Sequence, residues 1–98
     1  MKTQNFIMIL DYKAAIKALD NFVAEYPGTP FKEKALFYKL NSSYQLAINS
    51  VTSKMQDRLN VAKGAHNSLI KFNANTEFKE VADDMLARID KDLQQFSK

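Results

Sequence analysis

A seven-residue segment at residues 29–35 returns almost unchanged at residues 76–82. Thr-Pro-Phe-Lys-Glu-Lys-Ala is followed 47 residues later by Thr-Glu-Phe-Lys-Glu-Val-Ala. The similarity extends backwards, since Phe22 aligns with Leu69 at the same offset. A repeat of this length is typical of stacked helix pairs, because each pair has an apolar face that it cannot bury alone. The sequence therefore predicts an all-α, repeat-type fold.

The composition agrees with a helical domain and narrows its chemistry. The 98 residues include only two Gly and two Pro, and scarce helix breakers favour helices. Cys is absent, which excludes thiolate metal sites and Cys nucleophiles. The net charge is +3, and basic residues alternate with acidic ones instead of forming the basic stripe of a nucleic-acid binder. We expect no nucleic-acid partner.

Helical periodicity predicts one domain, residues 1–98, with four main helices. They are expected at residues 11–26, 30–49, 54–72 and 76–96. The fourth helix has the clearest apolar stripe, formed by Phe78, Ala82, Met85, Ile89, Leu93 and Phe96. The inward face of the second helix is expected to comprise Phe31, Ala35, Tyr38, Leu40, Tyr44, Ala47 and Ile48. Four such helices amount to about two helix pairs.

The residues at the helix ends predict how each helix begins or stops. Thr29 is expected to cap the second helix, with Pro30 at its first position. Gly28 is expected to adopt the left-handed conformation that follows many helices. Ser53 and Gln56 fit a capping box for the third helix. Gly64 weakens that helix, and the close approach of a neighbouring backbone is one physical reason for a glycine there.

Residues 1–10 resist assignment, because the apolar run Phe6, Ile7, Met8, Ile9 and Leu10 has no helical or strand period. One interpretation is a buried helix end or connection. The other is an apolar edge that a preceding repeat would cover, and if this edge is exposed we expect self-association through these five residues. The run is shorter than a signal-peptide core and no small-residue cleavage site follows it, so we expect no signal peptide here. No stretch is long enough to predict a membrane span.

Two motifs carry a resemblance to known proteins. The first is Asp11-Tyr12-x-x-Ala15-Ile16-x-x-Leu19-x-x-Phe22, closed by Pro27, which resembles the second half of a tetratricopeptide repeat. The second is Ala-Leu-Phe-Tyr-Lys-Leu-Asn-Ser-Ser-Tyr-Gln-Leu-Ala-Ile-Asn-Ser at residues 35–50, followed by Val51-x-Ser53-Lys54-x-x-x-Arg58. This second motif resembles the BamD family of outer-membrane assembly lipoproteins, in particular forms from Bacteroidetes. The resemblance covers residues 11–96 and implies a tetratricopeptide-like α-solenoid.

The resemblance implies a non-catalytic scaffold without cofactors at the periplasmic face of the outer membrane. Its implied partners are the barrel-assembly subunit BamA and unfolded outer-membrane proteins. The chain lacks the signal peptide and the lipidated Cys of the family, and it holds about two of roughly five expected repeats. We therefore interpret it as the C-terminal portion of a longer array. The alternative is an unrelated cytoplasmic tetratricopeptide adaptor that grips a short peptide.

The candidate partner-binding residues are Tyr38, Ser42 and Gln45, which share one side of the second predicted helix. In tetratricopeptide arrays the first helix of each pair lines the concave groove, so these side chains would face a peptide. The competing interpretation is that Tyr38 packs against a neighbouring helix. A small helical enzyme or a nucleic-acid module is a third class of function, disfavoured because no site or basic stripe supports it.

Groups with catalytic potential have simpler structural interpretations. His66 is the only His, and its repeat position predicts a core or boundary residue instead of a metal ligand or a base. Asp84 is expected to pair with Arg88 on a solvated acidic face of the fourth helix. Ser42 and Ser43 lack the Gly elbow of a nucleophile. We predict neither an active site nor a metal site.

Overall fold

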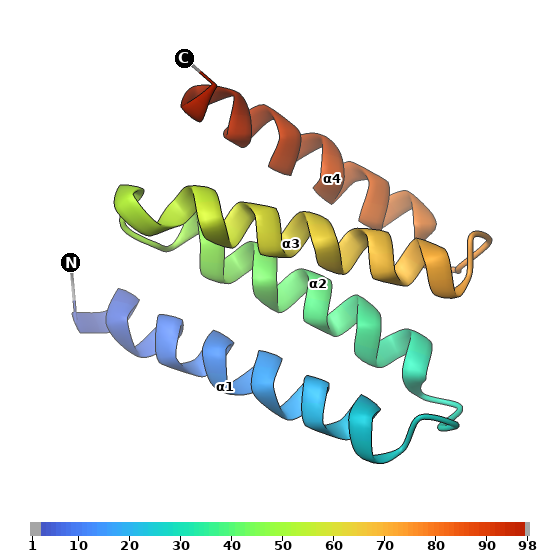
Figure 1. Cartoon of the computed structure of the whole chain (residues 1–98). Coiled ribbons are helices and arrows are strands. Elements are labelled where there is room, and N and C mark those ends of the chain that lie inside the picture. Colours follow the sequence, from blue (N-terminus) through green and yellow to red (C-terminus); the bar gives the residue numbers. More distant parts are fainter. Residues whose placement is uncertain (1–2, 98) are drawn as a thin grey trace.

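The chain forms four helices that pack side by side in an open array (Figure 1). In a computed structural model, residues 3–97 are described, with side chains from residue 8 onward. The helices are α1 (Thr3–Glu25), α2 (Lys32–Ile48), α3 (Thr52–Phe72) and α4 (Lys79–Leu93), followed by the short 3₁₀ helix η1 (Gln94–Phe96). Successive helices run in opposite directions, and α2 lies between α1 and α3 while α4 packs on α3 and on α2. The predicted all-α, helical-repeat-like fold is confirmed.

The recurring heptapeptide marks two helix starts that have the same local structure. The Thr29 hydroxyl accepts the Phe31 N–H at 3.2 Å, and the Thr76 hydroxyl accepts the Phe78 N–H at 3.3 Å. In both turns the next N–H bonds the threonine carbonyl three residues back. The cap predicted at Thr29 is wrong, because the residues that flank the starts of α2 and α4 are Phe31 and Phe78 and neither helix has a side-chain cap; the two threonines instead close the turn that precedes each helix. Regular α-helix begins two or three residues later than expected, because the first turn is tightened to a 3₁₀ pattern.

Other local expectations are wrong. Gly28 does not adopt a left-handed conformation, since no glycine of the described chain has a positive φ. The turn there closes by a hydrogen bond from the Thr29 N–H to the Tyr26 carbonyl. No capping box forms at Ser53, because α3 already begins at Thr52 and Ser53 lies inside the helix. The residue that precedes the helix is Val51, whose backbone is extended. A Cβ placed on Gly64 would meet no atom within 4 Å, so no backbone approaches it closely.

The first helix begins at Thr3, eight residues before the predicted start, and absorbs the unassigned segment. Met8 is half-buried, Ile9 is buried and Leu10 is exposed. Consecutive apolar residues that face both inward and outward leave no helical stripe, which is why periodicity missed this turn. The side chains of Phe6 and Ile7 lie outside the described residues. Self-association through this run stays a prediction, although Ile9 is packed inside the fold.

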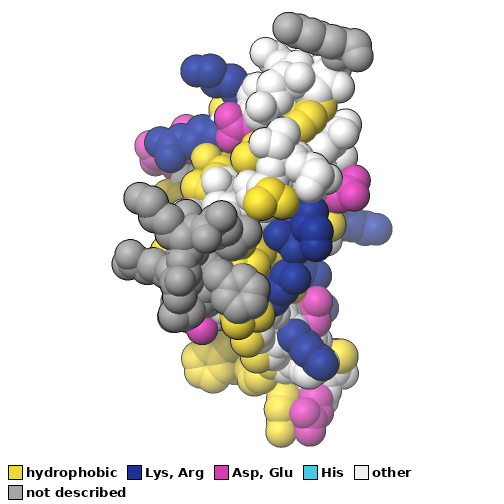
Figure 2. Space-filling view, turned by 90° about the vertical axis from the view of Figure 1, so that its left-hand side faces the viewer, with side chains coloured by type: hydrophobic (Ala, Val, Ile, Leu, Met, Phe, Trp, Pro, Cys, Tyr) yellow, Lys and Arg dark blue, Asp and Glu magenta, His cyan; other side chains and the backbone are white. Residues whose placement is uncertain are grey.

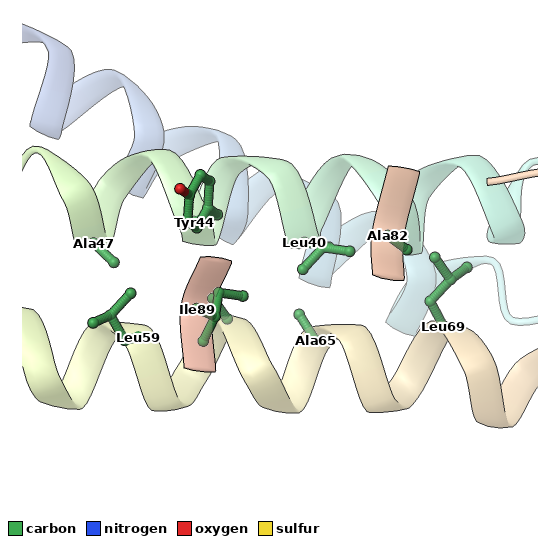
Figure 3. Packing of buried hydrophobic residues seen from close by; sticks show 9 residues of the cluster. Leu40, Tyr44, Ala47, Leu59, Ala65, Leu69, Ala82 and Ile89 are labelled. Atoms are coloured by element: carbon green, nitrogen blue, oxygen red, sulfur yellow. The ribbon is translucent and has the colours of Figure 1, made fainter. Parts of the chain in front are cut away.

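The hydrophobic core lies where α2, α3 and α4 meet (Figure 3). Its buried members are Leu40, Tyr44, Ala47, Leu59, Ala62, Ala65, Leu69, Ala82 and Ile89. The whole predicted stripe of the fourth helix joins this cluster, so that prediction is confirmed. The predicted inward face of α2 is only partly right, because Phe31, Tyr38 and Ile48 are exposed. Phe31 and Tyr38 lie on the side of α2 next to α1, where no further helix of the described chain covers them.

Candidate protein-binding surface

Exposed aromatic side chains gather on the side of α1 and α2 that is not covered by another helix. Phe22, Tyr26, Phe31 and Tyr38 form this surface, which we call the aromatic edge. Tyr26, Phe31 and Tyr38 are 54%, 58% and 52% exposed. Two hollows adjoin them, of about 450 and 190 Å³, and Phe22 and Phe31 line both. An apolar hollow rimmed by exposed aromatic rings is the kind of surface that protein interfaces use.

The three sequence-predicted site residues are only partly brought together. Tyr38 lines the smaller hollow of the aromatic edge and is half-exposed, so it is available to a partner. Its ring centroid lies 6.0 Å from that of Phe37, its neighbour in α2. Ser42 and Gln45, further along α2, are half-buried. Whether these three residues bind a peptide stays a prediction.

Sequence reasoning missed Phe31, which it assigned to the core. The repeat gave no signal of its exposure, because Phe31 aligns with Phe78, which the apolar pattern also assigned to the core. Phe78 is half-buried and its ring stacks on that of Phe37, with centroids 4.3 Å apart and an interplanar angle of 7°. No ring of the described residues stacks on Phe31. The same repeat position is thus packed in the second copy and open in the first.

A second set of contacts accompanies the ring stack at the start of α4. The Thr76 hydroxyl donates to Glu33 of α2 at 2.7 Å, and the Asn73 side-chain amide donates to the same carboxylate at 3.0 Å. These hydrogen bonds lower the pKa of Glu33 below its ordinary value of 4.5, and the bond from Asn73 has the largest effect. The Glu33 carboxylate therefore ties α2 to the connection that precedes α4.

A basic hollow of about 380 Å³ lies in the groove between α1 and α3, over α2. Lys13, Lys17 and Arg58 line it together with apolar side chains, and none of the three forms an ion pair within the described chain. Asp20, also in the lining, is held by Lys39 at 2.7 Å. Figure 2 shows Lys and Arg side chains gathered at mid-height beside hydrophobic ones on one face of the molecule.

The single histidine fastens α3 to α4. His66 is buried, and its Nε2 lies 3.0 Å from an Asp83 carboxylate oxygen, while Lys79 approaches the other oxygen at 3.0 Å. The hydrogen bond with His66 is the main cause that lowers the pKa of Asp83. The prediction that His66 is a core or boundary residue is confirmed. The predicted pair of Asp84 with Arg88 does not form, and α4 instead uses Asp83 and, toward Lys63, Asp90.

No three side chains of His, Asp or Glu come together as metal ligands within residues 3–97. None of the described helices combines the length and the apolar character that crossing a membrane requires. No family model matches the chain, and no curated protein or solved structure matches it significantly.

Proposed function

We propose that this chain is a non-catalytic protein-binding module and that the aromatic edge is its contact surface. The observation that carries the proposal is the exposure of Phe31 between Tyr26 and Tyr38, next to two apolar hollows. Aromatic side chains bury a large area on binding and lose few rotatable bonds, so they dominate the affinity of many interfaces. Exposed rings that adjoin a hollow are poorly explained by folding stability alone.

The resemblance to the BamD family supplies a specific partner for this proposal. The partner is then the barrel-assembly subunit BamA, bound through its periplasmic domains at the periplasmic face of the outer membrane. Unfolded outer-membrane proteins are a second class of partner that the resemblance suggests. The motif that carries the resemblance, residues 35–58, includes Tyr38 of the aromatic edge. This placement supports a contact role for α2.

Binding to purified BamA periplasmic domains tests the proposal. The wild-type chain is expected to bind in calorimetry, and the double variant Phe31→Ala, Tyr38→Ala is expected to lose about tenfold or more in affinity. Phe72→Ala is the matched control, because Phe72 is an exposed aromatic residue on α3, beside Lys32. Circular dichroism checks that all variants fold. No binding by the wild-type chain would contradict BamA as the partner, and equal losses from Phe72→Ala would contradict the aromatic edge.

A further inference from the structure

The two copies of the repeat offer a direct comparison between a filled surface and an open one. By the 47-residue offset, α4 corresponds to α2 and α3 corresponds to α1. The face of α4 that packs on α2 and α3 includes Phe78, Ala82 and Met85. The corresponding residues of α2 are Phe31, Ala35 and Tyr38, and all three line the smaller hollow of the aromatic edge. A helix placed on the aromatic edge would therefore pack against α2 in the same way that α2 packs against α4.

The filled surface shows which groups such a helix supplies. To the second copy, α2 presents the Phe37 ring, which stacks on Phe78, and the Glu33 carboxylate, which accepts the Thr76 hydroxyl. Glu33 precedes Phe37 by four residues, so both lie on one side of α2. The buried Leu40 follows one turn later. A carboxylate, an aromatic ring and a leucine at these steps are thus the groups that satisfy one copy of the repeat.

The first copy carries the matching groups without partners. The Thr29 hydroxyl accepts the Phe31 N–H as its counterpart Thr76 accepts Phe78, but as a donor it reaches no acceptor within the described residues. No ring of a described side chain stacks on Phe31. Lys34 also lines the smaller hollow and forms no ion pair in the described part of the chain. A hydroxyl donor and a free ammonium group favour an acidic ligand over a basic one.

We propose that the aromatic edge binds an amphipathic α-helix of a protein partner, with a carboxylate one turn before an aromatic residue and an apolar residue one turn after it. The carboxylate accepts the Thr29 hydroxyl, and the aromatic ring stacks on Phe31. The helix runs in the same direction as α2, since α2 and α4 run in the same direction (Figure 1). This inference rests on the proposed function and adds the chemistry of the partner.

A second copy of this chain does not fit the requirement. Its own helix with the required pattern is α2, but Glu33 and Phe37 of that helix are already engaged by Thr76 and Phe78. The outward side of α4 is mostly polar, with Glu80, Asp84, Ala87 and Lys91 exposed. The helix bound at the aromatic edge is therefore not α2 of a second copy.

The probe for this proposal is a stapled helical peptide with Glu, Phe and Leu at positions i, i+4 and i+7 and with Ala, Gln and Lys elsewhere. Its affinity for the full chain is measured by fluorescence anisotropy. Replacing the peptide Phe by Ala, or introducing Phe31→Ala in the protein, is expected to weaken binding about tenfold. When both changes are applied together, the loss of binding free energy is expected to be smaller than the sum of the two single losses, because both remove the same contact.

The carboxylate contact is tested by a double-mutant cycle. Thr29→Val is expected to weaken binding of the Glu peptide about fivefold and to leave a Glu→Ala peptide unaffected. Thr29→Ser keeps the hydroxyl and should restore affinity, and Thr52→Val, at an exposed threonine that begins α3, should change nothing.

The possible failures are distinguishable. A peptide that binds through Phe31 without any coupling between Thr29 and the peptide Glu overturns the proposed partner chemistry and leaves the proposed function standing. Absence of binding by every helical peptide also overturns it. The calorimetric result with BamA decides the proposed function separately, because that experiment makes no assumption about the sequence of the bound helix.

Discussion

The rings of Phe37 and Phe78 stack in parallel with their centroids 4.3 Å apart, and this contact joins α2 to α4. Phe31, which occupies the repeat position of Phe78, has no such partner in the described chain. The repeat is therefore conserved within the sequence but not in its packing. Stability measurements on the two phenylalanines can separate a folding role from a binding role.

Phe78→Ala is expected to destabilise the fold by about 2 kcal/mol, because it removes a half-buried ring and its stacking partner. Phe31→Ala is expected to change the free energy of unfolding by less than about 0.5 kcal/mol, since Phe31 is exposed. Urea denaturation followed by circular dichroism gives both values. Equal losses for the two variants would show that Phe31 is needed for folding.

Gly64→Ala is expected to stabilise the protein by about 1 kcal/mol. Gly64 lies inside α3 on an exposed side, and an added Cβ meets no atom within 4 Å. Alanine loses less conformational entropy than glycine when a helix forms. Thermal unfolding measures the change, and the exposed substitution Ala87→Gly in α4 is the reverse control with the opposite sign. A lower melting temperature for Gly64→Ala would reveal a close contact at this position.

The stabilising effect of Glu33 is expected to depend on pH. Its carboxylate has a pKa in the folded protein that lies below the ordinary value of 4.5. A lowered folded-state pKa means that the stabilisation is complete above about pH 4.5 and is lost as the pH falls through the folded-state value. Glu33→Gln should therefore lower the free energy of unfolding at neutral pH. The difference in unfolding free energy between the variant and the wild type should become smaller in acid.

The control for this experiment is Glu80→Gln. Glu80 occupies the repeat position of Glu33 on α4, but it is exposed and accepts no side-chain hydrogen bond within residues 3–97. Its profile of unfolding free energy against pH, from urea titrations between pH 2 and 7, should run parallel to that of the wild type. A parallel profile for Glu33→Gln would contradict the role assigned to its hydrogen bonds.

Two buried serines are expected to respond to substitution with opposite signs. The Ser43 hydroxyl is buried and has no hydrogen-bond partner among the described residues, so Ser43→Ala should stabilise the protein by up to about 1 kcal/mol. The Ser50 hydroxyl donates to the Leu46 carbonyl and accepts from Arg58 at 2.6 Å, so Ser50→Ala should destabilise by about 1 kcal/mol. Chemical denaturation compares the two. Destabilisation by Ser43→Ala would indicate a bound water or a partner for that hydroxyl.

Local signals predicted the helices best at the two copies of the heptapeptide. Thr29 and Thr76 lie three residues before the first residues of α2 and α4, and the apolar stripe from Phe78 to Phe96 predicted the packing of α4. The start of α1 could not be found in the same way, because the run that ends at Leu10 faces both the interior and the solvent. Helical periodicity detects apolar residues that share one face of a helix, and the residues of this run do not share one face.

The candidate site was harder to predict, because the exposure of its residues depends on whether another helix covers that side of α2. The pattern of α2 assigned both Leu40 and Phe31 to the core, yet only Leu40 is buried. An amphipathic stripe shows that a surface is apolar and cannot show whether another helix covers it. The hydrogen bond between Glu33 and Thr76 joins residues far apart in the chain, so no local motif signals it.

The long sequence separation between Glu33 and Thr76 also bears on the order in which the molecule opens. Ala82 and Ile89 are the only fully buried residues of α4, whereas α2 and α3 each contribute more. The contact of Glu33 with Thr76 closes a loop that contains all of α3, and closing such a loop costs chain entropy that neighbouring helices do not incur. Amide hydrogens of α4 should therefore exchange with solvent sooner than those of α2 and α3, through an opening that leaves the α2–α3 pair intact.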